Sequence, residues 1–331
     1  MRAAVITRPG GPEVLEILDV PRPLPREGEV LVRVYASALN RADLLQRQGR
    51  YPAPPGAPAN IPGLEIAGEV VELGVGAGRW SAGDRVFGIV GGGGNAEFAV
   101  THERELARIP TRLSWEEAAA VPEAFMTAHD ALITQARMSA GEGVLVHAVG
   151  SGVGLAATQL VRAFGGRCYG TARSERKIER AREFGLVEGV VVEADPAAIA
   201  DHVTRWTGGR GMDVVLDLVG GPYLSTSVEC AAPLGRIILI GLLGGRSATL
   251  NLGTILTRRL TLRGTLLRSR PGREKAAVTE SFATDVLPLL DRGDVRPVID
   301  QVFTLDRIRD AHALLESNET FGKVVVRHEP D

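Results

Sequence analysis

One stretch, residues 143–163, constrains the fold of this chain more than any other. The apolar run Val144–Ala148 is typical of a buried strand, and Leu155–Phe164 has the apolar pattern of a helix. The turn between them, Val149–Gly154, is rich in glycine. When a strand reverses tightly into a helix, the first helical N–H groups point outward, and only residues without a Cβ let a pyrophosphate approach them. The stretch therefore predicts a bound dinucleotide.

The glycine pattern is imperfect, because it reads Gly-x-Gly-x-x-Ala at Gly152, Gly154 and Ala157. The context supports it, since a buried strand precedes the glycines and the following helix is apolar nearly all round, as expected of a helix packed against a sheet. The alternative is a tight turn that binds nothing. We favour the dinucleotide, and the turn residues expected to contact it are Gly150, Ser151, Gly152, Val153 and Gly154.

The composition is that of an ordinary globular protein, with 331 residues, 44% apolar and 24% charged, which is enough for two domains. The net charge of -2 offers no bulk attraction to nucleic acid or to an acidic membrane, so neither partner is expected. No apolar run approaches the roughly 20 residues that span a bilayer, and a cytoplasmic location is expected. Cys168 and Cys230 are too few for a disulfide framework or a cysteine-rich zinc site.

The region before residue 120 is predicted to be rich in β structure. A period of two, typical of half-buried strands, is clearest in Val30–Ala36. A short helix is expected over Asn40–Gln48, with Asn40 at or near its N-cap, and a proline-rich loop follows from Tyr51 to Pro62. The predicted strands are Arg2–Thr7, Val14–Val20, Val30–Ala36, Ile66–Leu73, Asp84–Val90 and Ala96–Val100.

From Ser114 onward the pattern changes to helices, and the helix Phe125–Ala136 leads into the glycine-rich stretch. Strands and helices then alternate, which predicts a doubly wound parallel sheet of the Rossmann type. The helices at 273–289 and 306–316 and the strand Lys323–Arg327 do not fit that sheet and are expected to return to the first domain. The strands of the sheet are predicted at Val144–Val149, Arg167–Thr171, Val190–Glu193, Asp213–Leu218, Arg236–Ile240 and Leu260–Thr265, with helices near 153–164, 174–185, 196–206 and 222–232.

The end of the second strand of this sheet indicates which dinucleotide is bound. In NAD sites an acidic residue about 20 residues after the glycines binds the ribose hydroxyls, whereas NADP requires cations there. The segment Gly170–Ser174 has no carboxylate, and Arg173 and Lys177 surround a helix start, where cations are unfavourable unless an anion is bound. Ser174 is both a natural N-cap and a candidate phosphate donor. The pattern predicts NADPH; the alternative is a solvated basic helix start that Glu175 partly balances.

Several segments together carry a resemblance that covers essentially the whole chain. They are Asn40–Asp43, Pro62–Gly68, Gly83–Val86 and His147–Gly154. With the β-rich start, they make the chain resemble the zinc-independent, zeta-crystallin-like NADPH:quinone oxidoreductases of the medium-chain dehydrogenase/reductase superfamily. Two more specific segments, Ser37–Gly49 and Leu266–Arg270, are most similar to the branch of tumour-suppressor-induced quinone oxidoreductases.

The resemblance implies an α/β fold with a GroES-like catalytic domain from both chain ends, residues 1–124 and 267–331, and a Rossmann NADPH-binding domain over 125–266. It also implies a homodimer joined through the Rossmann sheets and the absence of the zinc of the alcohol dehydrogenase branch. The residues themselves also argue against a zinc site, because Ser37–Asn40 contains no cysteine and the usual His-Glu pair is replaced by Leu64-Glu65.

The resemblance also assigns catalytic residues. Chemistry without a metal rests on stacking the acceptor on the nicotinamide and stabilising the oxyanion that forms. Asn40 and Tyr51 match positions where the family places polar groups beside the nicotinamide and the substrate. Asn40 is expected to orient a carbonyl, and Tyr51 to donate a hydrogen bond to the reduced oxygen. The alternatives are that Asn40 is only an N-cap and that Tyr51 is only an aromatic of the proline-rich loop.

Further cofactor contacts follow from the same resemblance. Thr127 matches a residue that meets the nicotinamide ribose or amide, and Ser151 matches a serine that meets the pyrophosphate or influences the nicotinamide. The alternatives are helix back-bonding and simple turn chemistry. The Tyr and Arg that hold the 2′-phosphate in some relatives are Val192 and Asn318 here, which leaves Arg173 to compensate. The other predicted contacts lie after the fifth and sixth strands of the parallel sheet and near the C-terminus: Gly241, Leu242, Leu266, Leu267, Arg268 and Lys323.

The leading functional prediction is an NADPH-dependent quinone oxidoreductase that transfers hydride to a quinone without a metal. A second prediction is reduction of an activated alkene, such as an enal, an enone or an acryloyl thioester, because the same fold and hydride geometry serve both reactions. A third is a non-catalytic, crystallin-like NADPH-binding protein. Isolated histidines such as His147 are expected to be packing residues.

Overall fold

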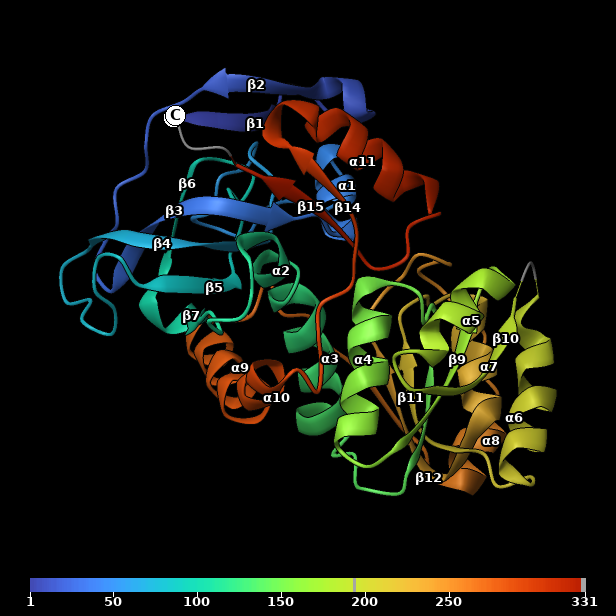
Figure 1. The fold of residues 1–331 in the computed structure, drawn as a ribbon. Helices are drawn as coiled ribbons and strands as arrows, with labels where there is room; N and C mark the ends of the chain where they lie inside the picture. Colours follow the sequence, from blue (N-terminus) through green and yellow to red (C-terminus); the bar gives the residue numbers. More distant parts are fainter. Residues whose placement is uncertain (193–194, 329–331) are drawn as a thin grey trace. The chain divides into compact units, whose positions relative to one another are not determined.

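The computed structural model describes residues 1–192 and 195–328 and divides into two compact units (Figure 1). Unit 1 consists of Met1–Met126 together with Leu267–Asp331, and unit 2 consists of Thr127–Leu266. Unit 1 is thus built from two segments that are separated in the chain by the whole of unit 2. Glu193, the last residue of a predicted strand, lies outside the described residues.

Unit 2 contains the doubly wound parallel sheet that the alternation of strands and helices predicts. Among the described residues its strands lie in the order β10-β9-β8-β11-β12-β13. The chain starts at the centre with β8, runs outward to β10, returns to pair β11 with β8, and then runs outward on the other side. Open parallel sheets bind ligands where the order reverses, here between β8 and β11. The strands are β8 (Gly143–Val146), β9 (Arg167–Ala172), β10 (Leu186–Val191), β11 (Met212–Asp217), β12 (Ala231–Leu239) and β13 (Thr261–Gly264).

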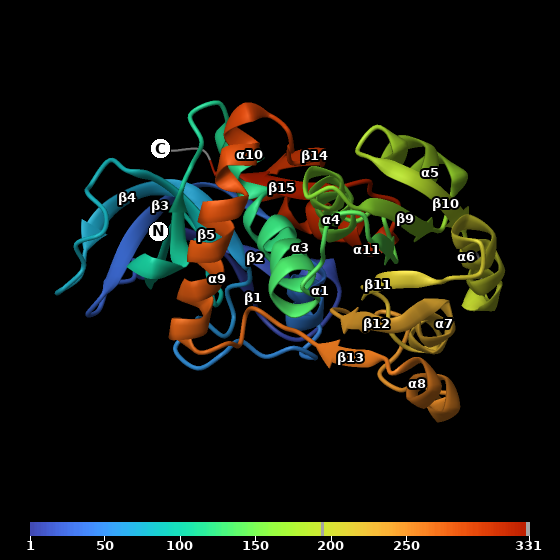
Figure 2. The same cartoon turned by 90° about the horizontal axis from the view of Figure 1, so that it is seen from below.

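Helices cover both faces of this sheet (Figure 2). The helices α4 and α5 lie on one face, α7 and α8 lie on the other, and α6 packs against α7. This arrangement follows from right-handed crossovers that run outward in opposite directions from the central strands. The helices are α4 (Gly152–Ala163), α5 (Glu175–Arg182), α6 (Ile199–Thr207), α7 (Pro222–Cys230) and α8 (Leu252–Arg258).

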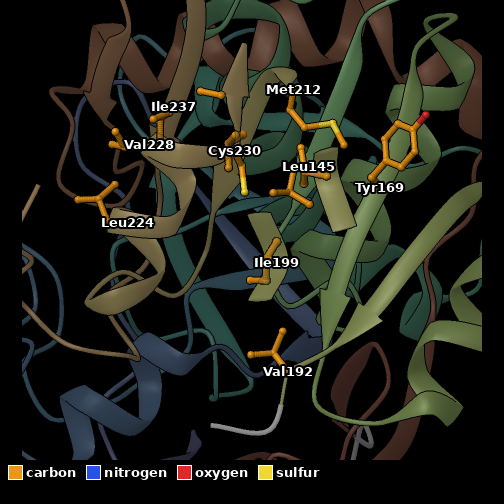
Figure 3. Close-up of a cluster of buried hydrophobic side chains, with 12 residues drawn as sticks. Leu145, Tyr169, Val192, Ile199, Met212, Leu224, Val228, Cys230 and Ile237 are labelled. Atoms are coloured by element: carbon orange, nitrogen blue, oxygen red, sulfur yellow. The ribbon is translucent and has the colours of Figure 1, made fainter. Parts of the chain in front are cut away.

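Alternating side chains along the strands of unit 2 build an apolar core under α6 and α7 (Figure 3). Leu145 of β8, Val215 of β11 and Ile237 of β12 belong to it and are 0% exposed. They pack with Ile199 of α6 and Val228 of α7. Full burial of each such side chain contributes about 1.5–3 kcal/mol, so this cluster fixes β8 and, with it, the start of the glycine-rich turn.

Two helical segments, one at the boundary between the units and one in unit 2, differ from the sequence prediction. The predicted helix Phe125–Ala136 has a π pitch over Pro122–Met126 and Asp130–Gln135, with the short helix α3 (Thr127–His129) between them. The sequence does not predict α8, because none of its residues is buried and it lacks the apolar period of a core-facing helix. Segments of π pitch occur frequently at functional sites, and Pro122–Met126 borders the cluster described below.

Unit 1 contains a largely antiparallel sheet in the order β14-β15-β3-β4-β5-β7, and β6 also pairs with β3. β15 pairs antiparallel with β3, with Val325 opposite Ala38, so the C-terminal segment completes the sheet that the N-terminal strands begin. A separate hairpin pairs β1 with β2. The strands are β1 (Arg2–Ile6), β2 (Leu15–Asp19), β3 (Glu29–Ala38), β4 (Glu65–Leu73), β5 (Arg85–Ile89), β6 (Phe98–His102), β7 (Leu106–Arg108), β14 (Ile299–Thr304) and β15 (Lys323–Arg327).

The helices of unit 1 are short except for α9 and α11. The single helix predicted over 273–289 is two helices, because the chain bends at Val286 and a new helix begins with Pro288 in its first turn. Within residues 1–192 and 195–328, no helix is long and apolar enough to cross a membrane. The helices are α1 (Arg41–Arg47), α2 (Trp115–Ala119), α9 (Gly272–Asp285), α10 (Leu287–Arg292) and α11 (Ile308–Ser317).

Candidate active site

The glycine-rich turn lies at the carboxyl end of β8, where the strand order reverses. Glycine is required at position 154, because a Cβ on Gly154 would lie 2.5 Å from the carbonyl oxygen of Ala148 and 2.7 Å from that of Val149. Ser151 caps α4, and its hydroxyl accepts a hydrogen bond from the Gly154 N–H at 3.1 Å. The remaining predicted turn residues are Gly150, which is buried, and Gly152 and Val153, which are partly exposed.

The predicted 2′-phosphate residues lie at the end of β9 and the start of α5. Ser174 occupies the N-cap position, and its side chain makes no cap hydrogen bond. Arg173 is exposed and Lys177 is partly buried. Burial raises the pKa of Tyr223, and the nearby Arg173 guanidinium opposes this shift. Val192, in contrast, is 5% exposed within the apolar core. This end of the sheet therefore presents basic side chains and a hydroxyl at a helix start.

The loops after β11 and β12 pack backbone against backbone. The Asp217 carboxylate accepts hydrogen bonds from two N–H groups of the following turn, at 2.9 and 2.8 Å. A Cβ on Gly241 would lie 2.3 Å from the Leu218 carbonyl oxygen, so packing alone requires glycine at this predicted cofactor residue. Leu242 is 46% exposed, and Leu266, after β13, is 55% exposed. Both leucines are therefore accessible for the cofactor contacts that the sequence predicts.

Thr127 and His147 are both buried in unit 2 but differ in their hydrogen bonding. Thr127 begins α3 and is 6% exposed, yet its hydroxyl has no hydrogen-bond partner among the described residues. It does not bond back to its own helix, which is a common role of threonine in helices. His147 is wholly buried with one ring nitrogen 3.2 Å from the Thr171 hydroxyl and the other 3.0 Å from that of Ser227, and burial lowers its pKa to about 4. His147 is thus a packing residue, as predicted, whereas Thr127 offers an unused hydroxyl.

In unit 1, Asn40 lies at the N-cap position of α1 with an extended backbone (φ -129°, ψ 158°). Its amide is fixed on both sides, since Nδ2 donates to Glu65 Oε1 at 2.8 Å and Oδ1 accepts from Lys323 Nζ at 2.7 Å. Its backbone N–H donates to the Asp43 carboxylate at 2.7 Å, one bond of a capping box. Residues at the starts of β4 and β15 therefore hold the Asn40 amide in one orientation.

Glu65 and Lys323 form a buried ion pair, with 2.6 Å between Oε1 and Nζ and side-chain exposures of 0% and 6%. Lys323 also donates to the Leu39 carbonyl oxygen at 2.9 Å, so its three ammonium donors are all used within this cluster. The second oxygen of Glu65 accepts a hydrogen bond from the Glu123 N–H at 2.7 Å. Glu65 is missing from the sequence predictions, although an acidic residue at the start of an apolar strand is a visible signal.

Tyr51 and Arg268, which the sequence assigns to separate roles, lie together in unit 1. The guanidinium carbon of Arg268 is 5.2 Å from the centre of the Tyr51 ring. Arg268 is 4% exposed, and it donates from Nε to the Gly91 carbonyl oxygen at 2.9 Å and from Nη2 to the Gln46 amide oxygen at 2.6 Å. Its Nη1 is buried without a hydrogen-bond partner in the described part of the chain. The neighbouring Leu267 is 6% exposed.

Burial shifts the pKa values of this pair in opposite directions. It raises the pKa of the half-buried Tyr51 phenol, an effect that the Arg268 charge opposes, and it lowers the pKa of Arg268. Tyr51 therefore carries its proton throughout the neutral range, because an unperturbed tyrosine already titrates near pH 10. The pair offers a phenol O–H and an unused guanidinium N–H as hydrogen-bond donors.

Two further carboxyls border this cluster. Asp43 is 0% exposed and accepts a hydrogen bond from the Gly63 N–H at 2.9 Å; burial raises its pKa to about 6, against its two backbone hydrogen bonds. Glu123 lies in the π-helical segment Pro122–Met126, and its Oε2 is buried without a partner in the described residues. Burial, reinforced by the Glu65 carboxylate, raises the pKa of Glu123 to about 7.

The chemistry open to unit 1 follows from these groups. No set of three or more His, Cys, Asp or Glu side chains able to hold a metal ion occurs within residues 1–192 and 195–328. Beside the oriented Asn40 amide, the cluster offers the Tyr51 phenol and the buried Arg268 guanidinium as donors able to stabilise a developing oxyanion. The carboxyl of Glu123 adds a group able to exchange a proton near neutral pH.

Known proteins are similar to this chain over nearly its whole length. The alcohol dehydrogenase GroES-like domain family matches residues 26–111, and the zinc-binding dehydrogenase family matches residues 152–284. The quinone oxidoreductase of Pseudomonas aeruginosa is 36% identical over 322 residues, which is 96% of each chain. The structure of a Pseudomonas syringae pv. tomato quinone oxidoreductase has a TM-score of 0.85 and 30% identity, covering 98% of this chain and 99% of that one. A mycobacterial protein solved in complex with NADPH has a TM-score of 0.87 and 28% identity, covering 99% and 100%.

Proposed function

Because this chain belongs to the quinone oxidoreductase family of the medium-chain dehydrogenase/reductase superfamily, we propose that it reduces quinones by hydride transfer from NADPH without a metal. The observation that carries the proposal is the cluster of unit 1 in which Glu65 and Lys323 fix the Asn40 amide and Arg268 packs on Tyr51. A quinone carbonyl that gains a hydride becomes an oxyanion, and fixed donors stabilise that charge at no cost of reorganisation.

In this proposal Asn40 and Tyr51 are the catalytic residues. Asn40 orients the acceptor carbonyl through an amide that cannot rotate without losing its bonds to Glu65 and Lys323. Tyr51 donates a hydrogen bond to the reduced oxygen, and the charge of Arg268 beside it strengthens that interaction. Lys323, which the sequence predicts as a cofactor contact, directs its three ammonium donors to Glu65, Leu39 and Asn40, and in this proposal it is instead a residue that positions Asn40.

The residues of unit 2 fit a dinucleotide. When bound, its reduced nicotinamide supplies the hydride. The partly exposed turn from Ser151 to Val153 at the start of α4 suits the pyrophosphate, because helix N-termini bind anions. The unused hydroxyl of Thr127 suits the nicotinamide carboxamide or ribose, which supplies the partner that the protein lacks. The loop residues Gly241, Leu242 and Leu266 offer further backbone contacts, as do Leu267 and Arg268 of unit 1.

We assign NADPH rather than NADH because of Arg173, Ser174 and Lys177 at the start of α5, where a phosphate relieves the unfavourable cations. The mycobacterial relative was solved with NADPH, which supports the assignment. Replacing Lys177 by Ala should raise the KM for NADPH roughly tenfold, as expected for one charged hydrogen bond, and leave that for NADH nearly unchanged. Arg205→Ala, at an exposed basic residue of α6, is the control. Equal changes for both cofactors would remove the assignment.

Oligomeric state and location complete the proposal. The edge strand β13 and the neighbouring α8 expose large apolar side chains, with Leu252 73%, Leu256 77% and Leu262 42% exposed. An exposed apolar patch beside an unpaired strand edge suits pairing with a second copy, so we propose a homodimer through this edge. Leu256→Asp should halve the mass measured by light scattering, whereas Leu24→Asp, at a residue of unit 1 that is 75% exposed, should not.

The net charge of -2 gives no attraction to membranes, and we place the protein in the cytoplasm.

The activity itself is tested with the purified protein. Steady-state oxidation of NADPH and NADH is measured with 1,4-benzoquinone, with larger quinones and with short enals. We expect turnover with quinones to exceed turnover with enals. Higher turnover with enals would identify an alkene reductase, and binding of NADPH without turnover on either class would identify a non-catalytic protein.

A further inference from the structure

Glu65 and Glu123 form a pair of neighbouring carboxyls with unlike partners. The Glu65 carboxylate is wholly buried, faces the Lys323 ammonium at 2.6 Å and also accepts hydrogen bonds from Asn40 and from the Glu123 backbone. The Glu123 carboxyl has no comparable ion pair or hydrogen bonds, and its Oε2 is buried without a hydrogen-bond partner in the described residues. When two carboxyls share a site, the one that holds the cation stays ionised and the other binds the proton.

The charged groups that shift the pKa of Glu123 come from several elements of unit 1. Glu65 of β4 and Asp43 of α1 raise its pKa, while Lys323 of β15 and Arg268 lower it, and burial is the largest effect. Tyr51 also lies within electrostatic range of Glu123. Glu123 as a whole residue is partly exposed, although its Oε2 is buried. The carboxyl therefore lies within electrostatic range of the phenol and the guanidinium, on a residue that is partly exposed to water.

Quinone reduction needs a proton as well as a hydride. The quinone takes up two electrons with the hydride and becomes a hydroquinone monoanion, while the nicotinamide is oxidised. A proton on the anionic oxygen then gives the neutral hydroquinone. Tyr51 is a poor source, because a phenol of raised pKa is no stronger an acid than the hydroquinone itself.

Resting on the function proposed above, we propose that Glu123 is the general acid of the reaction: its carboxylic acid O–H bond breaks, the proton passes to the anionic oxygen of the reduced quinone, and the Glu123 carboxylate is reprotonated from water. Tyr51 and Arg268 hold the oxygen by hydrogen bonds during this transfer. The Glu65 carboxylate, paired with Lys323, raises the pKa of the neighbouring Glu123.

The first test needs neither cofactor nor substrate. The protein is labelled with ¹³C at the glutamate carboxyl, and the wild type and Glu123→Gln are titrated by NMR. One carboxyl of the wild type should titrate with a midpoint near 7, matching the raised pKa of Glu123, and it should be missing from the variant. Titration of every glutamate below about pH 5.5, near the ordinary range, would overturn the proposal.

The second test is kinetic. In the wild type, kcat for 1,4-benzoquinone should be constant below pH 7 and fall as the pH rises above it, with a solvent deuterium isotope effect on kcat. Glu123→Gln should lower kcat roughly 100-fold, within the range for general acids, and should remove the pH dependence while leaving the dissociation constant of NADPH unchanged. Glu274→Gln, at an exposed residue of α9, should behave as the wild type.

The outcomes separate this proposal from the one on which it rests. Quinone reduction by Glu123→Gln at the wild-type rate and pH profile overturns the role of Glu123 and leaves the proposed function standing. A wild type that titrates a glutamate near pH 7 and reduces no quinone overturns the proposed function and this role with it. If Glu123→Gln fails to fold, the pH profile and isotope effect of the wild type still decide, because a flat profile without an isotope effect contradicts the proposal.

Discussion

The ion pair between Glu65 and Lys323 should be among the most costly interactions in unit 1 to break. Lys323→Met removes the ammonium and keeps the length of the side chain, and it leaves a carboxylate that is 0% exposed without a counter-charge. Removing one partner of a buried pair costs about 3–5 kcal/mol, because the other charge remains desolvated. Two hydrogen bonds to Glu65, from Asn40 and Glu123, survive, so we expect a loss near the lower end of this range.

The loss is measured by urea unfolding followed through tryptophan fluorescence, since Trp80 and Trp115 both lie in unit 1. The double variant Glu65→Gln with Lys323→Met should recover about 2 kcal/mol relative to the sum of the single variants, because no isolated charge remains. The exposed pair Arg22–Glu72, with side chains 45% and 47% exposed and 3.4 Å apart, is the control, and Arg22→Met should cost less than about 1 kcal/mol. A loss below 1 kcal/mol for Lys323→Met would refute the reasoning.

Four further outcomes follow from the geometry of the site. Gly154→Ala should destabilise unit 2 by about 1–3 kcal/mol and weaken NADPH binding in a fluorescence titration, because its Cβ would meet a carbonyl oxygen at 2.5 Å. Thr127→Val should leave stability unchanged or slightly raised, since it removes an unpartnered buried hydroxyl, and should raise the KM for NADPH. Tyr51→Phe should lower kcat for quinones about tenfold without changing NADPH affinity. His147, whose pKa is lowered to about 4, binds its proton more readily when unfolded, so it should lower stability as the pH drops from about 6.5 to 4, by up to about 1.4 kcal/mol per pH unit. His147→Gln should reduce the acid slope without removing it, because burial also lowers the pKa values of His312 and His328.

Each of these outcomes has a contrary result. A stable Gly154→Ala with full NADPH affinity would show that α4 can move away from β8. An unchanged KM in Thr127→Val would leave its hydroxyl without a ligand, and unchanged turnover in Tyr51→Phe would make Tyr51 a loop aromatic. An unaltered pH slope in His147→Gln would mean that His147 is solvated in the folded protein.

The parallel sheet and its glycine-rich turn could be predicted from the sequence because their signals are local. The run from Val144 to Phe164 contains the strand, the turn and the helix in sequence order, and each has its own apolar period. The predicted packing role of His147 also follows from its place in an apolar strand. The exposed helix α8 carries no such period, since its leucines face away from the core, and it is therefore missing from the prediction.

The cluster of unit 1 could be predicted only in part. Resemblance to a family predicts Asn40 and Tyr51, whereas Glu65, Asp43 and Glu123 are absent from the predicted site residues. Their role arises from contacts between residues far apart in the chain, such as Glu65 with Lys323, and no periodicity or spacing encodes that pairing. The packing of Arg268 on Tyr51 likewise depends on the tertiary fold.

The place of β15 in the sheet of unit 1 sets an order of events during synthesis. The ribosome synthesises β3 and β4, which begins with Glu65, before all of unit 2, and it synthesises Lys323 only after unit 2. Until that moment the Ala36–Ala38 end of β3 lacks its β15 partner and the Glu65 carboxylate lacks the Lys323 counter-ion. Unit 2 can complete its folding in this interval. A nascent chain that stalls before β15 would display an unpaired strand next to a buried charge, and quality-control chaperones bind such edges. The last strand to emerge is thus the one that completes the sheet of unit 1.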